Sequence, residues 1–158
     1  MDELIRIAIV LAASTVGTMG IILQFGIEKR VIFWALISSI LCCAAYEIAY
    51  LFGCGYFLSS LIASAVAAAF SDVWAHFLRV PATVLIIPGI VPLVPGSRLY
   101  YTMLGAVNSN MQMFYEHGSA ALQMAAGLAI GIIAVTAISR PVNERLAEIR
   151  QKRQNKAK

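Results

Sequence analysis

One stretch of the sequence decides how this chain folds: residues 81–107, which read PATVLIIPGIVPLVPGSRLYYTMLGAV. The stretch is apolar enough for a membrane helix, but three prolines and two glycines fall within nine residues, namely Pro88, Gly89, Pro92, Pro95 and Gly96. Each internal proline removes a helical hydrogen bond and clashes with the preceding turn, which costs about 3 kcal/mol. We therefore predict a membrane-spanning segment that breaks near its middle.

The backbone groups freed by such a break must find partners in protein or in a water-filled cavity, because lipid offers none. We therefore expect this segment inside a helix bundle. Broken helices in transporters present carbonyl groups and a half-helix N-terminus to the substrate. Here the second half-helix is expected to begin at Gly96 and Ser97, with Ser97 as its N-cap and its positive dipole end toward a carboxylate. The alternative is a kinked packing helix without a ligand.

The whole chain carries too little charge for a protein that folds in water. Of its 158 residues, 60% are hydrophobic and 13% are charged, whereas a soluble domain has about 25% charged residues. The net charge of +4 belongs mostly to the end of the chain, since seven of the twelve Lys and Arg residues lie at or after Arg140. This pattern argues against a cytoplasmic enzyme, a disordered chain and a nucleic-acid-binding module. It indicates a polytopic membrane protein.

Crossing a bilayer takes about 20 apolar residues, and the sequence contains five such runs. The predicted spans are residues 7–25, 31–52, 56–78, 81–107 and 119–139. Residues 108–118 are predicted to form an external polar loop in which Glu116 and His117 are solvated. The predicted fold class is all-α: a polytopic membrane helix bundle of about five spans whose fourth span is broken. It forms a transmembrane domain over residues 1–139, followed by a basic cytoplasmic tail over residues 140–158.

The loop charges predict the orientation, because Lys and Arg accumulate on the cytoplasmic side of a membrane. With five spans, one side has Arg6 alone, and the other has Lys29, Arg30, Arg79 and the seven bases of the tail. We predict a multi-pass protein of the inner membrane with its N-terminus outside and its C-terminus in the cytoplasm. If the broken span turned back as a re-entrant hairpin, four crossings would remain and the assignment would fail at one end.

The tail allows two interpretations. Pro141 suits the first turn of a helix, and Val142, Leu146 and Ile149 would share one face of that helix. Such a helix could lie on the anionic inner leaflet. The alternative is a solvated, positively charged anchor.

Small residues at four-residue spacing predict where two spans meet closely. Ser60, Ser64 and Ala68 share one face of the third span, and Gly127 and Gly131 share one face of the last. Faces of this kind let helix backbones approach each other in lipid. The alternative is the ordinary abundance of small residues in membrane helices.

Few ionisable side chains lie inside the spans, where a charge costs about 2.5–3.5 kcal/mol at a helix centre. Arg98 is a candidate ligand for a substrate carboxylate, because a guanidinium matches a carboxylate with two hydrogen bonds. Its alternatives are an outward-pointing side chain and an ion pair with Glu47. Glu47 is a candidate carrier of a coupling proton or an interfacial acid. Asp72 and His76 would share a helix face, as a proton relay or as an interfacial capping or gating pair.

Two stretches carry a resemblance to a known family: DVWAHFLRVPATV over residues 72–84 and IIPGIVPLVPGSRLYYTMLGAV over residues 86–107. The PLVPG core at residues 92–96, followed by Tyr100 and Tyr101, is the most specific part. Together with the length and the order of spans, these stretches resemble the small membrane subunit of the threonine/serine exporter family in its two-component form.

The resemblance implies export of small carboxylate-bearing metabolites across the inner membrane. Family members are linked to threonine and serine, and some two-component systems to succinate. The resemblance also implies a larger membrane subunit as partner, which would supply the other half of the transporter and a soluble N-terminal region. Arg98 departs from the family pattern, in which a small or apolar residue often stands at this position, so the resemblance itself gives Arg98 no role.

These observations predict a transporter subunit rather than an enzyme, with no cofactor and no metal. The expected substrate-binding residues are Pro88, Gly89, Pro92, Pro95, Gly96, Ser97, Arg98, Tyr100 and Tyr101, and the expected coupling or gating residues are Glu47, Asp72 and His76. The expected partners are a small carboxylate or amino-acid substrate, the lipid bilayer and other subunits in a hetero- or homo-oligomer, but no nucleic acid. The alternatives are an assembly subunit that binds no substrate and a homo-oligomeric pore.

Overall fold

A computed structural model describes the backbone of residues 2–156 and the side chains of residue 5 and residues 7–139. Residues 2–156 are helical apart from short turns and contain no strand. In chain order, the elements are α1 (Asp2–Phe25), α2 (Lys29–Leu51), α3 (Tyr56–Leu78), α4 (Thr83–Ile90), the 3₁₀ turn η1 (Val91–Leu93), α5 (Gly96–Val107) and α6 (Met111–Lys156). The predicted all-α fold class is confirmed.

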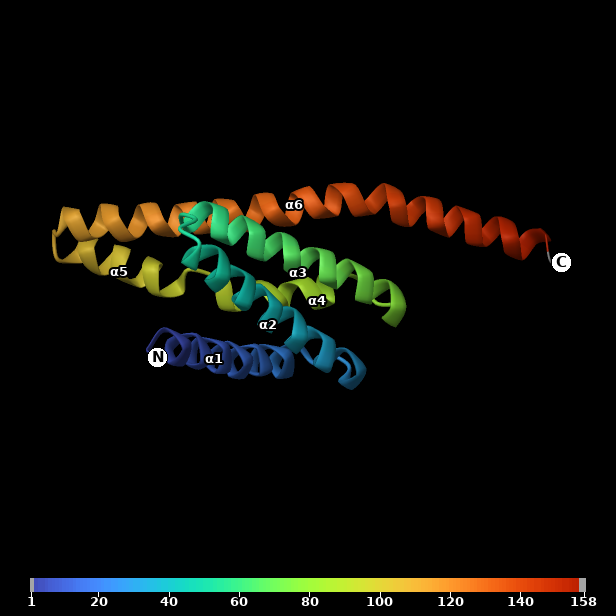
Figure 1. Ribbon diagram of the computed structural model, residues 1–158, viewed down its shortest axis with the longest axis horizontal. Helices are drawn as coiled ribbons and strands as arrows, with labels where there is room; N and C mark the ends of the chain where they lie inside the picture. The colour runs from blue at the N-terminus through green and yellow to red at the C-terminus, as the bar shows by residue number, and fades with distance from the viewer. Residues whose placement is uncertain (1, 157–158) are drawn as a thin grey trace.

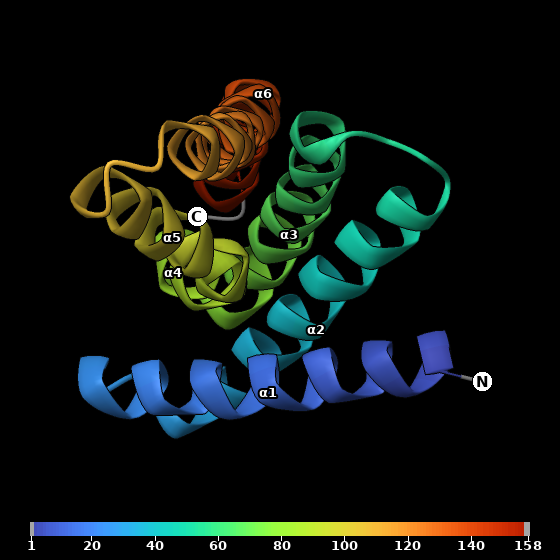
Figure 2. The same ribbon diagram turned by 90° about the vertical axis from the view of Figure 1, so that its left-hand side faces the viewer.

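The helices run back and forth along one long axis (Figure 1). The start of α1, the α2–α3 turn and the α5–α6 turn lie toward one end, which we call the N-terminal end of the bundle. The α1–α2 turn, the α3–α4 connection and the end of α6 lie toward the other, which we call the C-terminal end. Figure 2 shows α1 along one side of the bundle and the α5–α6 pair on the opposite side, with α2, α3 and α4 between them.

The number of membrane-length segments agrees with the prediction. Four helical segments are long and apolar enough to cross a membrane: Ile7–Phe25, Lys29–Leu51, Tyr56–Leu78 and Met111–Ser139. The pair Thr83–Leu93 and Gly96–Val107 passes the same test as a unit that is bent by 48°. Counted as one broken span, this pair brings the total among the described residues to five. A 48° bend keeps the chain advancing toward the N-terminal end (Figure 1), whereas a re-entrant hairpin would turn it back.

The break falls where the prolines are. Pro88 lies inside α4, Pro92 lies in η1, and Pro95 occupies the N-cap of α5. Because a proline nitrogen carries no hydrogen, neither Pro92 nor Pro95 can donate to the carbonyl four residues earlier. The chain crosses this gap with a 3₁₀ turn, in which the Val94 amide donates to the Val91 carbonyl at 3.0 Å.

The predicted loop over residues 108–118 is wrong. The connection is a turn of three residues, and α6 begins at Met111. Asn110 accounts for the early start, because its side-chain oxygen accepts a hydrogen bond from the Met113 amide at 3.2 Å, as an N-cap does. Polarity alone predicted a loop here, although a capped helix can begin with polar residues.

Helix α6 also continues through Pro141 to Lys156. The expectation that Pro141 lies in the first turn of a separate helix is therefore wrong, because α6 does not end where the tail was predicted to begin. The side chains of Val142, Leu146 and Ile149 lie outside those that the structure describes. The two interpretations of the tail, and its border with the transmembrane domain, stay predictions.

Helices α3 and α6 share the most extensive contact of any pair in the described bundle. A methyl group at Gly127 would collide with the Phe57 carbonyl, and one at Gly131 would lie 2.6 Å from the Leu61 carbonyl. The Ser64 hydroxyl donates to the Gly127 carbonyl at 3.4 Å. The predicted close contact between the two small-residue faces is therefore confirmed.

Helix α2 connects the other helices through buried hydroxyl groups. The hydroxyl oxygens of Thr18 in α1 and Ser39 in α2 are 2.7 Å apart, and those of Ser38 in α2 and Ser71 in α3 are 3.2 Å apart. All four side chains are fully buried. Gly89 of α4 lies against Ser38, so closely that a Cβ atom there would collide with the Ser38 hydroxyl. These contacts hold α4, and with it the broken span, against the centre of the bundle.

Candidate functional site

The break opens onto a small cavity of about 190 Å³, with walls from α1, α2, α6 and the broken span. We call it the break cavity. Five residues that the sequence singled out line it: Glu47, Pro92, Pro95, Ser97 and Arg98. The structure thus brings an acid of the second predicted span next to the broken core of the fourth.

Arg98 is half-buried on the wall of the break cavity and has partners on two other helices. Its guanidinium donates to the Tyr56 hydroxyl at 3.0 Å and to Nδ1 of His117 at 3.2 Å. The guanidinium carbon also lies 5.0 Å from the centre of the Tyr56 ring, which is a cation–π distance. Because an arginine side chain only donates, Nδ1 of His117 is the acceptor and carries no proton. We call Tyr56, Arg98 and His117 the Arg98 cluster.

The Arg98 cluster joins three helices, since Tyr56 begins α3, Arg98 lies in the first turn of α5 and His117 lies in α6. These contacts orient the guanidinium, which has more N–H groups than its two side-chain hydrogen bonds use. A donor that is oriented before a ligand arrives loses less conformational freedom on binding. Arg98 is therefore suited to a carboxylate in the break cavity.

The start of α5 provides a second positive element beside the cavity. The helix begins at Gly96, with Pro95 at the N-cap and no side-chain hydrogen bond there. The predicted N-cap role of Ser97 is wrong, because Ser97 already lies inside the first turn. The Gly96 amide donates to the Val94 carbonyl at 2.7 Å, but without a side-chain cap the next amide groups of α5 keep the positive end of the helix dipole available to an anion.

The opposite wall of the break cavity carries an acid and a polar contact between α1 and α2. Glu47 of α2 lines the cavity together with Ser14 of α1 and Cys43 of α2. The Cys43 thiol donates to the Ser14 hydroxyl at 3.3 Å. A small molecule in the cavity would therefore meet positive charge from α5 and an ionisable carboxyl group from α2.

Two predicted ligands in the first half of the broken span lie apart from the break cavity. Pro88 is buried and lines a different cavity nearer the C-terminal end. Gly89 is buried against Ser38. Their positions explain how α4 packs on α2 and give them no contact with the break cavity.

In the second half of the broken span, three more predicted ligands do not line the break cavity. Gly96 is exposed at the start of α5. Tyr100 and Tyr101 are 62% and 42% exposed, and neither lines the break cavity. Tyr101 instead packs against His117, with 5.1 Å between the ring centres.

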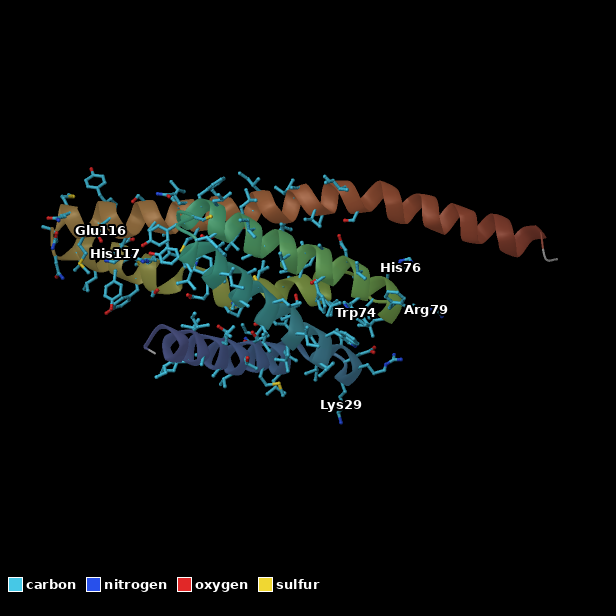
Figure 3. All side chains as sticks on the ribbon, in the orientation of Figure 1. Lys29, Trp74, His76, Arg79, Glu116 and His117 are labelled. Carbon is cyan, nitrogen blue, oxygen red and sulfur yellow. The ribbon has the colours of Figure 1, made fainter. Side chains whose placement is uncertain are left out.

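Asp72 and His76 lie in the half of α3 that leads to the C-terminal end, away from Glu47. The Asp72 carboxylate accepts a hydrogen bond from the Ser139 hydroxyl of α6. His76 is exposed and lies near Arg79 at that end (Figure 3). The three predicted coupling or gating residues therefore do not form one group, and their roles stay predictions. Among the described residues, no three His, Cys, Asp or Glu side chains are placed to hold a metal ion.

The sequence analysis missed two members of the Arg98 cluster. His117 was expected to be solvated, but it is half-buried on α6 near the N-terminal end (Figure 3) and bonded to Arg98. Tyr56 directly follows the α2–α3 turn, where an aromatic residue is an ordinary interfacial anchor. Arg98 and His117 are 19 residues apart, and a helical hairpin with a three-residue turn brings these positions side by side, but the polar residues 108–118 indicated a longer loop.

A row of tyrosines also escaped the sequence analysis. Tyr46 lines the break cavity, Tyr50 stacks on it at 6.1 Å between ring centres, and Tyr56 stacks on Tyr50 at 5.7 Å. The row runs from α2 to the start of α3 and thus links the acidic wall of the cavity to the Arg98 cluster.

The chain matches the model of a known protein family. The family model described as "Threonine/Serine exporter, ThrE" matches residues 10–138. The matched region includes the break cavity, the Arg98 cluster and all or most of each of the five apolar segments. No curated protein and no solved structure matches the chain. The chain therefore belongs to the threonine/serine exporter family, a family of transporters rather than of enzymes.

Proposed function

We propose that this chain is a subunit of a secondary transporter that exports small amino or carboxylic acids, such as threonine, serine or succinate. The family match supports the class of activity. One observation carries the site: Arg98 and the start of α5 lie on the wall of the break cavity. Half-helix N-termini at broken spans are where other transporters bind anionic substrate groups.

The size and charge of the break cavity support a small carboxylate as substrate. Its volume of about 190 Å³ is below the roughly 300–1,000 Å³ of pockets for drug-sized ligands. A guanidinium can bind both oxygens of a carboxylate, and the dipole of α5 favours the same negative group. These interactions are stronger in a water-poor cavity than in bulk solvent. The substrate carboxylate is therefore assigned to Arg98 and the first turn of α5.

Glu47 is assigned the coupling proton. It lines the same cavity as Arg98, and ionisable residues inside membrane spans commonly serve as proton carriers in transporters. When Glu47 is deprotonated, its negative charge repels the substrate carboxylate. Protonation of Glu47 removes this repulsion. A proton and a substrate that bind together at one small cavity would leave together, so an outward substrate gradient would drive export and a higher pH outside than inside would aid it.

The proposed assembly pairs this chain with a larger membrane subunit of the same family in the inner membrane. Five segments are few for a carrier with two alternating states, and α1 has only 11% of its apolar window buried within the described chain. We place the N-terminal end outside the cell, because Lys29 and Arg79 lie at the other end (Figure 3), as does the end of α6. This arrangement puts the Arg98 cluster nearer the outer side and leaves α1 accessible to a partner.

The proposal is tested by measuring export from cells of the source organism. In these cells, the chromosomal gene for this chain has been deleted and a variant is expressed in its place. These cells retain the natural partner. Arg98→Ala should reduce the export of threonine, serine or succinate by about a hundredfold, because it removes a charge-assisted, bidentate contact. Arg79→Ala is the matched control, since Arg79 lies at the C-terminal end on none of the walls of the break cavity. It should export like the wild type.

Arg98→Lys refines the same experiment, because lysine keeps the charge but loses the paired geometry. Export that is partly retained in Arg98→Lys and lost in Arg98→Ala supports a carboxylate site. If Arg98→Ala exports all three substrates normally at normal protein levels, the assigned site is wrong. That result would favour the assembly subunit that binds no substrate, or a homo-oligomeric pore whose substrate path lies elsewhere.

A further inference from the structure

The break cavity is the first of three cavities that follow the contact between α1 and the broken span. The second, of about 280 Å³, shares Ser14 and Pro92 with the break cavity. The third, of about 410 Å³, lies beyond it toward the C-terminal end and includes Phe25 and Pro88. We call them the middle cavity and the loop cavity, and we call their common line the α1 seam.

One stripe of α1 faces all three cavities. Val10 and Ser14 line the break cavity, Ser14, Gly17 and Ile21 line the middle cavity, and Phe25 lines the loop cavity. These positions are three or four residues apart, so they follow one face of the helix. The three cavities therefore follow one another along one face of α1.

The opposite side of the seam is the proline-rich segment itself. Pro95 and Pro92 line the break cavity, Pro92 and Val91 line the middle cavity, and Pro88 and Ile87 line the loop cavity. Pro92 cannot donate to the Pro88 carbonyl, as residue 92 of a regular helix would. In lipid such a backbone group is costly, but a water-filled groove satisfies it.

The packing of α1 leaves room along this groove. Its apolar window is 11% buried, compared with 28–33% for the windows of the other three membrane-length helices. A Cβ atom at Gly17 would have no neighbour within 4 Å. No packed side chain therefore closes the middle cavity at Gly17.

We propose that the α1 seam is the path by which a small carboxylate-bearing solute travels between the loop cavity and the break cavity, with α1 as its movable wall. This inference rests on the proposed function, because it takes the break cavity as the binding site. The loop cavity is the opening of the path at the C-terminal end, where Glu28 and Thr83 are among its walls. The middle cavity is the passage between the other two, and Gly17 is one of its walls.

Two glycines of α1 provide a matched test. Gly17 lines the middle cavity, whereas Gly20 lines none of the three cavities; a Cβ atom at either position meets open space. In the deletion strain, Gly17→Leu should reduce export about tenfold or more at a normal protein level, because the side chain fills the passage. Gly20→Leu should export within about twofold of the wild type. Equal export by the two variants would overturn the inference.

A labelling experiment separates this path from two other occupants of the seam. Ile21→Cys, in the seam, is compared with Met19→Cys, on the other face of α1, in a background carrying Cys42→Ala, Cys43→Ser and Cys54→Ser. A charged, water-soluble thiol reagent should modify Ile21→Cys but not Met19→Cys, and threonine or succinate should slow the reaction. Labelling of Ile21→Cys by an apolar maleimide alone would show that lipid fills the seam and overturn the inference. Labelling that occurs only without the partner subunit would assign the seam to a protein contact and overturn it equally.

Arg98→Ala in the same strain distinguishes failure of this inference from failure of the proposed function. If Arg98→Ala loses export and Gly17→Leu exports normally, the binding site stands and the path is wrong. If Arg98→Ala exports normally, the proposed site itself is wrong, and with it the path that leads there.

Discussion

The two sides of this bundle are built in opposite ways. Between α3 and α6, glycines lie against serines and carbonyl groups, so that even a methyl group at Gly127 or Gly131 has no room. Along α1, Gly17 faces open space and three cavities follow one another. Close-packed interiors deform little, whereas loosely packed elements move at low cost. The comparison indicates a fixed frame that includes α3 and α6, and a mobile side formed by α1.

The largest expected effect comes from filling the fixed frame. Gly131→Leu drives a side chain into the Leu61 carbonyl and the Ser64 hydroxyl, and overpacking against backbone should cost about 3 kcal/mol of unfolding free energy. Gly20→Leu, on the mobile side, should leave stability unchanged. Equilibrium unfolding in detergent measures both variants. Equal stability of the two would contradict the division into a fixed and a mobile side.

The next effect tests the chemistry of the break cavity, which α1 of the mobile side helps to line. Glu47→Gln mimics a permanently protonated acid, so export driven by a pH gradient should fall about tenfold or more, whereas exchange of labelled for unlabelled substrate should persist. Reconstituted vesicles that contain the complete transporter allow both rates to be measured. If both rates fall together, Glu47 belongs to substrate binding or folding instead of proton coupling.

A smaller effect is expected at the Arg98 cluster, where the fixed frame orients the guanidinium. His117 of α6 holds Arg98 of α5 through Nδ1, and a hydrogen bond to a charged group contributes about 1.5 kcal/mol, or roughly tenfold in export. His117→Phe keeps a ring beside Tyr101 but removes the acceptor, and it should show this loss. His117→Asn retains an acceptor and should restore most of the export.

The smallest effect concerns the attachment of α1 to the bundle. Thr18→Val removes the hydroxyl that meets Ser39, and polar contacts between membrane helices are worth about 0.6 kcal/mol on average. Unfolding in detergent should show a loss of this size, while the level of protein in the membrane stays normal. A loss as large as that of Gly131→Leu would mean that α1 belongs to the fixed frame.

The sequence predicts those parts of the fold that depend on local chemistry. A proline cannot donate a backbone hydrogen bond in any context, so the break at residues 91–95 could be predicted from Pro92 and Pro95. Small residues at four-residue spacing likewise predict the contact of Gly127 and Gly131 with α3, because only small side chains permit that approach. The first prediction holds whatever the neighbouring helices do, and the second needs only a small-residue face on α3.

The parts that could not be predicted depend on how far a helix extends. A cap at Asn110 shortens the expected loop to three residues, and this shortening brings His117 beside Arg98. A proline at the N-cap of α5 likewise moves Ser97 into the helix. At the candidate site, the backbone break, Arg98 and Glu47 were therefore predicted from the sequence. Tyr56 and His117, the side chains that orient Arg98, were not.

The neighbouring serines of α2 have a consequence for biogenesis. Ser39 meets Thr18 of α1, whereas Ser38 meets Ser71 of α3 and lies against Gly89 of α4. As the chain emerges from the ribosome, Ser39 can find its partner as soon as the first hairpin is inserted, but Ser38 must wait for α3. The surface around Ser38, against which Gly89 packs, has then already formed when the proline-rich segment enters the membrane. The segment least able to remain helical alone is thus synthesised after the surface that receives it.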